Sequence, residues 1–259
     1  MKKTILALAV LLFAFTLADA DTVKKTYKMD GFSGIQADDA FEIVVEQSDN
    51  FNIEVEITEE FLPYLVVKNR AGILEFSFSK LPMKLKQKNR KKVAKAVIQL
   101  PELTYVGLAG ASTLRSNDQF SSAMQTFAIE LTGGSDITNL NVEAPEVDVK
   151  LSGASKAIVS FRSSDVKADV TGASRLDVVG RTADFTVKVN SASKVNAEAF
   201  EAKNVDVKAS GASTVRVCPV EELTVELGGA SKCEYYGDSE ELRIKSDKIG
   251  GASTLKRHK

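Results

Sequence analysis

Apolar residues in the second half of the chain recur in a pattern of about twenty residues, built around the triplet Gly-Ala-Ser or a variant with one residue changed. The triplets begin at Gly110, Gly133, Gly153, Gly172, Ser191, Gly211, Gly229 and Gly251. With the first residue of each triplet as position 0, position −2 is apolar in every copy. A repeat of this length predicts a solenoid, in which each unit is one coil stacked on the previous one.

Three further positions of the repeat are mostly apolar. Position −4 is apolar in every copy except the last, where Asp247 stands, and position −6 is apolar in the five central copies. Position +4 holds Leu114, Ile137, Ala157, Leu176, Val195, Val215, Cys233 and Leu255. Because side chains alternate along a strand, we predict two inward-facing strands per coil, joined by a corner at Gly-Ala.

Charged residues between the apolar ones fit the same stacking. In-register coils place opposite charges side by side: Asp148 by Lys167, Lys150 by Asp169, Asp169 by Lys188, and Lys208 by Glu226. A shift of one residue would turn the apolar positions outward and separate these pairs. The predicted fold is therefore an all-β parallel β-helix. A leucine-rich repeat would need a Leu-rich consensus, and a β-sandwich would need a turn about every 8–12 residues.

Residues 21–100 alternate without this repeat. Apolar residues alternate with mostly polar ones in three stretches, which are residues 41–46, 51–57 and 74–78. This alternation predicts strands that bury one face, and residues 59–64 are expected to form one helical turn that Pro63 limits. We expect residues 21–259 to form a single β-helical domain, with an irregular N-terminal part (21–100) and regular Gly-Ala-Ser repeats (101–259).

The first twenty residues have the pattern of a secretory signal peptide. Met1-Lys2-Lys3 provides a positive start, residues 5–17 are apolar, and Ala18-Asp19-Ala20 is a cleavage motif. The apolar run is shorter than the roughly 20 residues that a membrane span needs. We predict cleavage before Asp21 and export without a transmembrane anchor. The pattern leaves open whether the protein stays in the periplasm, at the cell surface or is secreted.

Composition argues against several activities. A net charge of −1 gives no support to nucleic-acid binding. The single histidine, His258, lies in a basic tail, so a catalytic triad would lack its base. Cys218 and Cys233 occupy different positions of the repeat, which favours two free cysteines over a disulfide. We expect no catalytic residue, no metal and no cofactor.

The Gly-Ala-Ser triplet itself has a structural interpretation. Its Ser, at position +2, is expected to face inward and to bond the turn backbone or the next Ser, rather than to act as a nucleophile. Position 0 is Ser191 in one copy, which indicates that small size matters more there than a left-handed backbone.

Two groups of basic residues are candidates for binding an anion. The run from Lys84 to Lys92 is interpreted as a solvated loop between strands, with an anionic partner as the alternative. Position +3 faces solvent and places Lys156, Arg175 and Lys194 in three successive coils, roughly 4.8 Å apart. This candidate cation row suits a repeating anion such as an acidic glycan. It is equally typical of a solvated edge that discourages aggregation.

Several stretches together resemble one family. Phe32-Ser33-Gly34-Ile35, the stretch Phe41–Gln47 and the serial Leu/Val-x-Gly-Ala-Ser units are similar to the putative auto-transporter adhesin, head GIN domain family of exported proteins, common in Bacteroidota. The resemblance spans nearly the whole chain after residue 20. It implies a right-handed parallel β-helix and a surface or adhesive role, and it transfers no catalytic or binding residues.

These features favour an exported, non-catalytic binding or scaffold protein of the bacterial cell envelope, adhesin-like, with a glycan or a surface protein as partner. The alternative is a glycan-active enzyme of the polysaccharide lyase or hydrolase kind, because parallel β-helices host such enzymes. It would need paired carboxylates or a Lys/Arg base in a cleft. A third interpretation is a purely structural envelope component. The ligand and the oligomeric state are left open.

Overall fold

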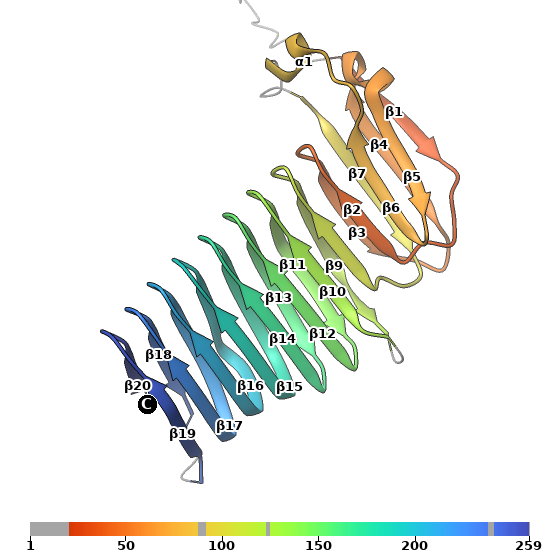
Figure 1. Cartoon of the computed structure of the whole chain (residues 1–259). Coiled ribbons are helices and arrows are strands. Elements are labelled where there is room, and N and C mark those ends of the chain that lie inside the picture. The colour runs from red at the N-terminus through yellow and green to blue at the C-terminus, as the bar shows by residue number, and fades with distance from the viewer. Residues whose placement is uncertain (1–20, 88–91, 123–124, 238–240, 259) are drawn as a thin grey trace, which may run out of the picture.

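The protein is a parallel β-helix. A computed structural model describes residues 21–87, 92–122, 125–237 and 241–258, and the predicted signal peptide lies outside them. The strands stack in successive coils along one axis, with β1 (Thr22–Tyr27) near one end and β20 (Thr254–His258) at the other (Figure 1). The predicted all-β parallel β-helix is confirmed.

Each coil contributes one strand to each of two sheets that enclose the apolar core. The first sheet contains, in spatial order, β5 (Leu65–Arg70), β6 (Ile73–Phe78), β2 (Gly34–Ala37), β8 (Tyr105–Leu108), β10 (Phe127–Leu131), β12 (Glu146–Leu151), β14 (Asp165–Val170), the ends of β15 (Arg175–Val189), β16 (Lys194–Ala209) and β17 (Thr214–Leu227), and β19 (Arg243–Ile249). The second sheet contains β1, β4 (Asn52–Thr58), β7 (Ala94–Leu100), β3 (Glu42–Gln47), β9 (Thr113–Ser121), β11 (Asp136–Glu143), β13 (Lys156–Arg162), the beginnings of β15, β16 and β17, β18 (Lys232–Tyr236) and β20.

The interior columns are the predicted ones. Leu151 of β12 pairs with Val170 of β14, which pairs with Val189 of β15, and all three are at most 1% exposed. The +4 column is equally continuous across the second sheet, through Ala157, Leu176, Val195, Val215, Cys233 and Leu255. Each coil therefore buries its aliphatic side chains against those of its neighbours.

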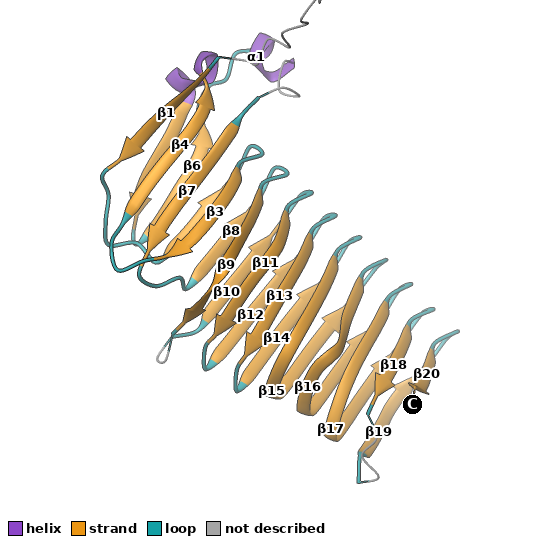
Figure 2. Ribbon diagram, turned by 180° about the vertical axis from the view of Figure 1, so that it is seen from behind, coloured by secondary structure: helices purple, strands orange, loops and turns teal. Residues whose placement is uncertain are grey.

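The Gly-Ala-Ser corners lie in a row along one edge of the stack (Figure 2) and require a left-handed backbone. Position 0 has a positive φ in every copy, from 61° at Gly110 to 79° at Gly172, and φ is 65° even at Ser191. The corners also stack closely, since a Cβ added to Gly172 would lie 2.4 Å from the carbonyl oxygen of Gly153. The prediction that small size matters more than conformation is therefore wrong, because both requirements apply to the same residue.

The Ser at position +2 faces inward, as predicted. In the seven copies from Ser112 to Ser231 it is at most 1% exposed. The hydroxyl of Ser135 donates to the carbonyl oxygen of Thr132 at 2.9 Å, and that of Ser155 donates to Ser152 at 2.8 Å. The hydroxyls of Ser135 and Ser155 thus satisfy backbone groups of their own corners, whereas those of Ser213 and Ser231 donate to carbonyl oxygens of the preceding coil.

The N-terminal part contains one coil that has no Gly-Ala-Ser triplet. Strands β2 and β3 pair in parallel with β8 and β9 and meet at a corner where Asp39 and Ala40 have φ values of 64° and 61°. On the other side of this coil lie β6 and β7, followed by the antiparallel strands β1, β4 and β5. The 3-10 helix η1 (Glu59–Tyr64) is the predicted helical turn.

The basic run is not simply a solvated loop. It begins on a short exposed helix, α1 (Met83–Gln87), and residues 88–91 lie outside the described residues. Lys92 packs inward, with its ammonium 4.3 Å from the centroid of the Phe78 ring, and it donates a hydrogen bond to the carbonyl oxygen of Asp39. Partial burial lowers the pKa of Lys92. The prediction of a solvated loop is therefore wrong for this residue.

The predicted charge neighbours all occur in the register of the first sheet. Lys208 lies 3.7 Å from Glu226, the predicted partner. Lys167, although opposite Asp148, instead contacts Asp165 of its own strand at 3.2 Å. Exposed ion pairs have similar, small energies, so the register does not decide which of two nearby carboxylates a lysine contacts.

Both cysteines are free, as predicted. Cys233 is fully buried in the +4 column, and this burial raises the pKa of its thiol to about 12. Cys218 on β17 is half-buried, and this burial raises the pKa of its thiol as well. Neither thiol is activated as a nucleophile.

Candidate functional site

The candidate cation row lies on the outer face of the second sheet. Lys156 on β13, Arg175 on β15 and Lys194 on β16 are exposed and are successive register neighbours. Because adjacent strands lie about 4.8 Å apart, the backbones of Lys156 and Lys194 are about 10 Å apart. The structure thus brings the three residues into one line.

The row continues into a groove toward the C-terminal end. Lys194 is followed in register by Thr214 of β17 and Lys232 of β18. The short Thr214 side chain leaves room between the two lysines. The groove, called the basic groove below, has a volume of about 320 Å³ and is lined by Arg175, Lys194, Val195, Asn196, Thr214, Arg216, Lys232 and Glu234.

Glu234 forms the C-terminal wall of the basic groove. Its side chain is 4% exposed, accepts a hydrogen bond from Nε of Arg216 at 2.9 Å, pairs with Lys232, and lies 3.1 Å from Nε2 of His258. The hydrogen bonds from Lys232 and Arg216 lower the pKa of Glu234 to about 2. The carboxylate is therefore ionised at neutral pH and already balanced by its cationic neighbours.

Arg175 is held in a fixed orientation beside the groove. Its Nε and Nη2 atoms donate to the two carboxylate oxygens of Asp177 at 2.7 and 2.9 Å. These hydrogen bonds raise the pKa of Arg175, while the positive charge of nearby Arg216 acts in the opposite direction. A bidentate pair of this kind gives a defined geometry as well as energy.

Lys156 and Lys194 remain available to a ligand. No carboxylate of the described residues lies within 4.0 Å of either ammonium group. In the basic groove, four cations thus face the single carboxylate of Glu234. The arrangement can hold an anion by charge: Arg175, Arg216 and Lys232 are held by carboxylates, while Lys194 in the groove and Lys156 beside it are free to move toward the anion.

Arg216 and Lys232 are site residues that the sequence pattern did not reveal. Lys232 occupies the same +3 position as the predicted row, but Thr214 interrupts the run of cations. Arg216 stands at +5 of its coil, two residues further along the same outer face. Examining +5 together with +3 would have found it, since alternate residues of a strand face the same side.

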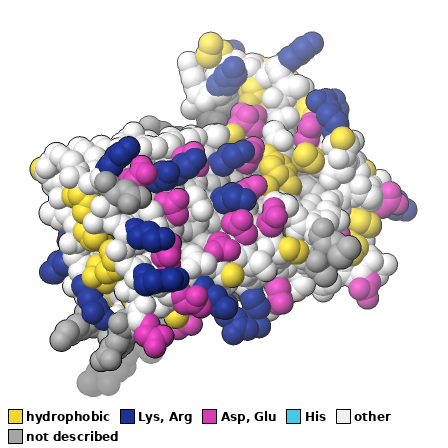
Figure 3. Space-filling model, turned by 60° about the horizontal axis from the view of Figure 1, so that its bottom comes forward, with side chains coloured by type: hydrophobic (Ala, Val, Ile, Leu, Met, Phe, Trp, Pro, Cys, Tyr) yellow, Lys and Arg dark blue, Asp and Glu magenta, His cyan; other side chains and the backbone are white. Residues whose placement is uncertain are grey.

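Other grooves on the described surface are less positive. Arg162 and Arg181 are register neighbours in a groove of about 610 Å³ that Glu198 and Glu201 also line. A hollow of about 380 Å³ on the first sheet has three lysines and one carboxylate in its lining: Lys188, Lys208, Lys248 and Glu226. Figure 3 shows acidic and basic side chains interspersed over the face it presents, so a cluster of one sign is a local feature.

Two further features concern the described residues as a whole. No three His, Cys, Asp or Glu side chains in them are grouped as a metal ion would require. None of the helices they form has the length and apolar character needed to cross a membrane.

Comparison with known proteins matches the chain to one family and to several solved structures. The family model "Putative auto-transporter adhesin, head GIN domain" matches residues 31–239. A solved putative adhesin from Parabacteroides distasonis is similar, with a TM-score of 0.79 and 16% identity over 93% of this chain and 98% of that one. A putative adhesin from Parabacteroides merdae has a TM-score of 0.78 and 15% identity over 93% and 98%.

A third solved structure carries a different name. It is a putative lipid binding protein from Parabacteroides distasonis, with a TM-score of 0.76 and 16% identity over 93% of this chain and 98% of that one. No curated protein matches the chain in sequence. At such low identity, the similarity to the solved structures shows the fold.

Proposed function

Because the chain belongs to the auto-transporter adhesin, head GIN domain family, we propose that it is an exported, non-catalytic binding protein of the bacterial cell envelope with an adhesin-like role. Its cation row and basic groove bind an acidic glycan. Export rests on the signal-peptide pattern of residues 1–20, and the ligand class rests on the charge and geometry of the second sheet.

The alignment of Lys156, Arg175 and Lys194 on adjacent strands is the observation that carries this proposal. Stacked coils repeat a cation at a fixed spacing of about 4.8 Å, and a polymer with regularly spaced carboxylates or sulfates presents a matching series of anions. Asp177 and Glu234 are already paired with cations, whereas Asp136 on β11 is the register neighbour of Lys156 and offsets part of the positive charge at that end of the row. A rigid sheet also holds the row in place without ordering a loop on binding.

The basic groove supports binding rather than glycan hydrolysis. A glycosidase needs two carboxyl groups about 5–10 Å apart, one of which must be protonated to act as the general acid. Glu234 is the single carboxylate that lines the groove, and its pKa of about 2 keeps it ionised. A glycan hydrolase is therefore the alternative that this groove does not favour, while a lyase, which can use a Lys or Arg base, would be revealed by cleavage of the bound glycan.

Binding of the protein from residue 21 onward to polygalacturonate, with neutral dextran as reference, tests the proposal. We expect polygalacturonate alone to bind, and its affinity to fall as salt screens the charges. The double variant Lys156→Gln/Lys194→Gln should bind about tenfold more weakly, because it removes the two cations without carboxylate partners. Arg175 is left intact, since its loss would also leave Asp177 unpaired.

A matched control removes two lysines from the first sheet, Lys188→Gln/Lys248→Gln. It has the same change in charge, and its affinity for polygalacturonate should stay within about twofold of the original. Equal loss in the two double variants would show attraction to overall charge and would overturn the assignment of the site. Binding to anionic lipid vesicles but not to the acidic glycan would replace a glycan by a lipid surface as the partner.

A further inference from the structure

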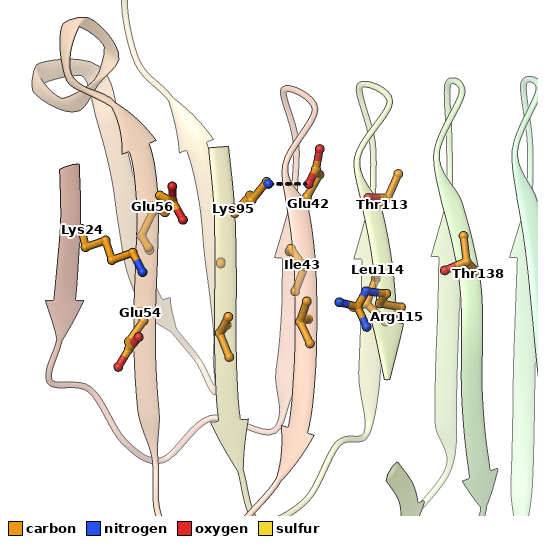
Figure 4. A pocket seen from close by; sticks show the side chains of 14 residues that line it. Lys24, Glu42, Ile43, Glu54, Glu56, Lys95, Thr113, Leu114, Arg115 and Thr138 are labelled. Carbon is orange, nitrogen blue, oxygen red and sulfur yellow. Dashed lines mark ion pairs between the residues drawn. The ribbon is translucent and has the colours of Figure 1, made fainter. Parts of the chain in front are cut away.

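A second pocket lies on the same sheet at the N-terminal end, away from the basic groove. Strands β1, β4, β7, β3, β9 and β11 form it (Figure 4), and its volume is about 330 Å³. This volume lies within the range of about 300–1,000 Å³ found for small-molecule sites. Its lining carries three cations and three carboxylates, which are Lys24, Lys95, Arg115, Glu42, Glu54 and Glu56. A lining without net charge does not suit a polyanion.

One line of residues across this pocket contains an ion pair and two further opposite charges that are neighbours in register. Lys95 lies 3.7 Å from Glu42 on the neighbouring strand (Figure 4). Glu56 faces Lys24 in the register of β1 and β4, and accepts a hydrogen bond from the hydroxyl of Thr22 at 3.3 Å. Two positive and two negative charges thus alternate along this line, which therefore has no net charge to attract a ligand.

In the next row of register neighbours, two residues of opposite charge lie at opposite ends of the pocket. In register across β4, β7, β3 and β9 the row reads Glu54, Val97, Val44, Arg115. Three strand spacings separate Glu54 from Arg115, about 14 Å between their backbones. Neither forms an ion pair within 4.0 Å among the described residues. The two valines between them are half-buried and form an apolar floor.

We infer that this pocket binds a short zwitterionic peptide with free termini and apolar side chains. The ammonium group of such a peptide would lie at Glu54, its carboxylate at Arg115, and its side chains over Val97 and Val44. Figure 4 shows the guanidinium of Arg115 directed toward β3. The planar fork of an arginine suits a carboxylate, which it can bind through two parallel hydrogen bonds.

The length of the site favours about three residues. An extended chain spans at most about 3.3–3.6 Å per residue, so a tripeptide covers about 10–11 Å. The side chains of Glu54 and Arg115 can reach inward across the remaining distance. No aromatic ring lines the pocket on which a sugar could stack. The lining therefore matches a peptide better than a glycan.

Calorimetric titration with the tripeptide Leu-Ala-Leu tests the inference. The free peptide should bind, while N-acetylation or C-amidation of the same peptide should each weaken binding about fivefold or more. Glu54→Gln should abolish the discrimination against the acetylated form, and Arg115→Gln should abolish that against the amidated form. Both side chains are exposed, so neither variant removes a buried contact.

The controls separate this site from the basic groove. The variant Lys156→Gln/Lys194→Gln should bind the tripeptide with unchanged affinity, and Glu54→Gln should bind polygalacturonate with unchanged affinity. The inference is overturned if the free tripeptide does not bind at millimolar concentration. It is also overturned if the free and blocked peptides bind the original protein equally well.

Discussion

At the scale of single residues, the left-handed corner is the strictest requirement of the repeat. The residue at position 0 must adopt a positive φ, and it must leave room for the carbonyl oxygen of the preceding coil. An L-residue in this conformation costs roughly 1–2 kcal/mol, because its Cβ approaches the following carbonyl oxygen. Ser191 shows that one coil tolerates this cost.

Replacing Gly172 by Ala should lower the free energy of unfolding by about 2–4 kcal/mol. The added Cβ would meet the Gly153 carbonyl oxygen at 2.4 Å, in addition to the strain of a φ of 79°. Conversely, Ser191→Gly should raise the free energy of unfolding by roughly 0.5–1 kcal/mol, because it relieves the same strain. Urea denaturation followed by circular dichroism measures both effects.

Gly134 provides the matched control for these variants. It lies at position +1, where other copies have Ala, and nothing lies within 4 Å of a Cβ added there. Gly134→Ala should change the free energy of unfolding by no more than about 0.5 kcal/mol. An equal loss in Gly172→Ala and Gly134→Ala would mean that the corner conformation is not the cause.

At the scale of strands, the register could be predicted, but the partners of individual side chains only in part: Lys208 contacts the predicted Glu226, whereas Lys167 contacts Asp165. The columns through Leu151 and Val189 follow from a periodicity of the sequence, because burial allows one alignment of the coils. The β2–β3 coil has Asp39 where the other coils have Gly or, once, Ser, so no periodic signal marked it. The inward packing of Lys92 could not be predicted either, because the aromatic rings around its ammonium come from residues distant in sequence.

The same limit applies to the site. The row from Lys156 to Lys194 follows from one position of the repeat. The cluster at Glu234 combines a side chain from β18 with partners on β17 and β20, and it depends on how long side chains bend toward one another. Such bending is decided by local packing, which a repeat pattern does not contain.

Glu234→Gln tests this cluster through the pH dependence of stability. The folded pKa of about 2 is lower than the ordinary value of 4.5. The stabilisation is therefore complete above about pH 4.5 and is lost as the pH falls toward 2. At pH 7 the free energy of unfolding of the variant should be about 1–3 kcal/mol lower than that of the original protein. This difference should shrink between pH 4.5 and pH 2.

Urea midpoints at several pH values measure that difference. The control is Glu226→Gln. The side chain of Glu226 is 38% exposed, and its carboxylate lies 3.7 Å from the ammonium of Lys208. An exposed pair of this kind contributes about 0.5 kcal/mol or less. If the Glu234→Gln difference stayed constant down to pH 2, the carboxylate would not be the group that titrates.

At the scale of the whole molecule, stability is shared between neighbouring coils, and the two ends of the stack differ. The antiparallel strands β1, β4 and β5 cover the N-terminal end. At the other end, β19 and β20 each pair with one neighbour among the described residues, and Ile244 and Ile249 are 42% and 46% exposed. In a stack of this kind, a coil with one neighbour has about half the interface of an interior coil.

Leu176 and Leu255 occupy the same +4 column and so compare an interior coil with the last one. Leu176 is 1% exposed, while Leu255 is half-buried. Leu176→Ala should reduce the free energy of unfolding by about 2–5 kcal/mol, because it leaves a cavity between two coils. Leu255→Ala should cost less than about 1 kcal/mol, since solvent already reaches the side chain and the coil can relax around the change.

Hydrogen exchange should show the same gradient, with protection greatest in β14–β17 and least in β19 and β20. Equal protection along the stack, together with equal costs for the two leucines, would mean that the coils unfold as one unit without a weaker end.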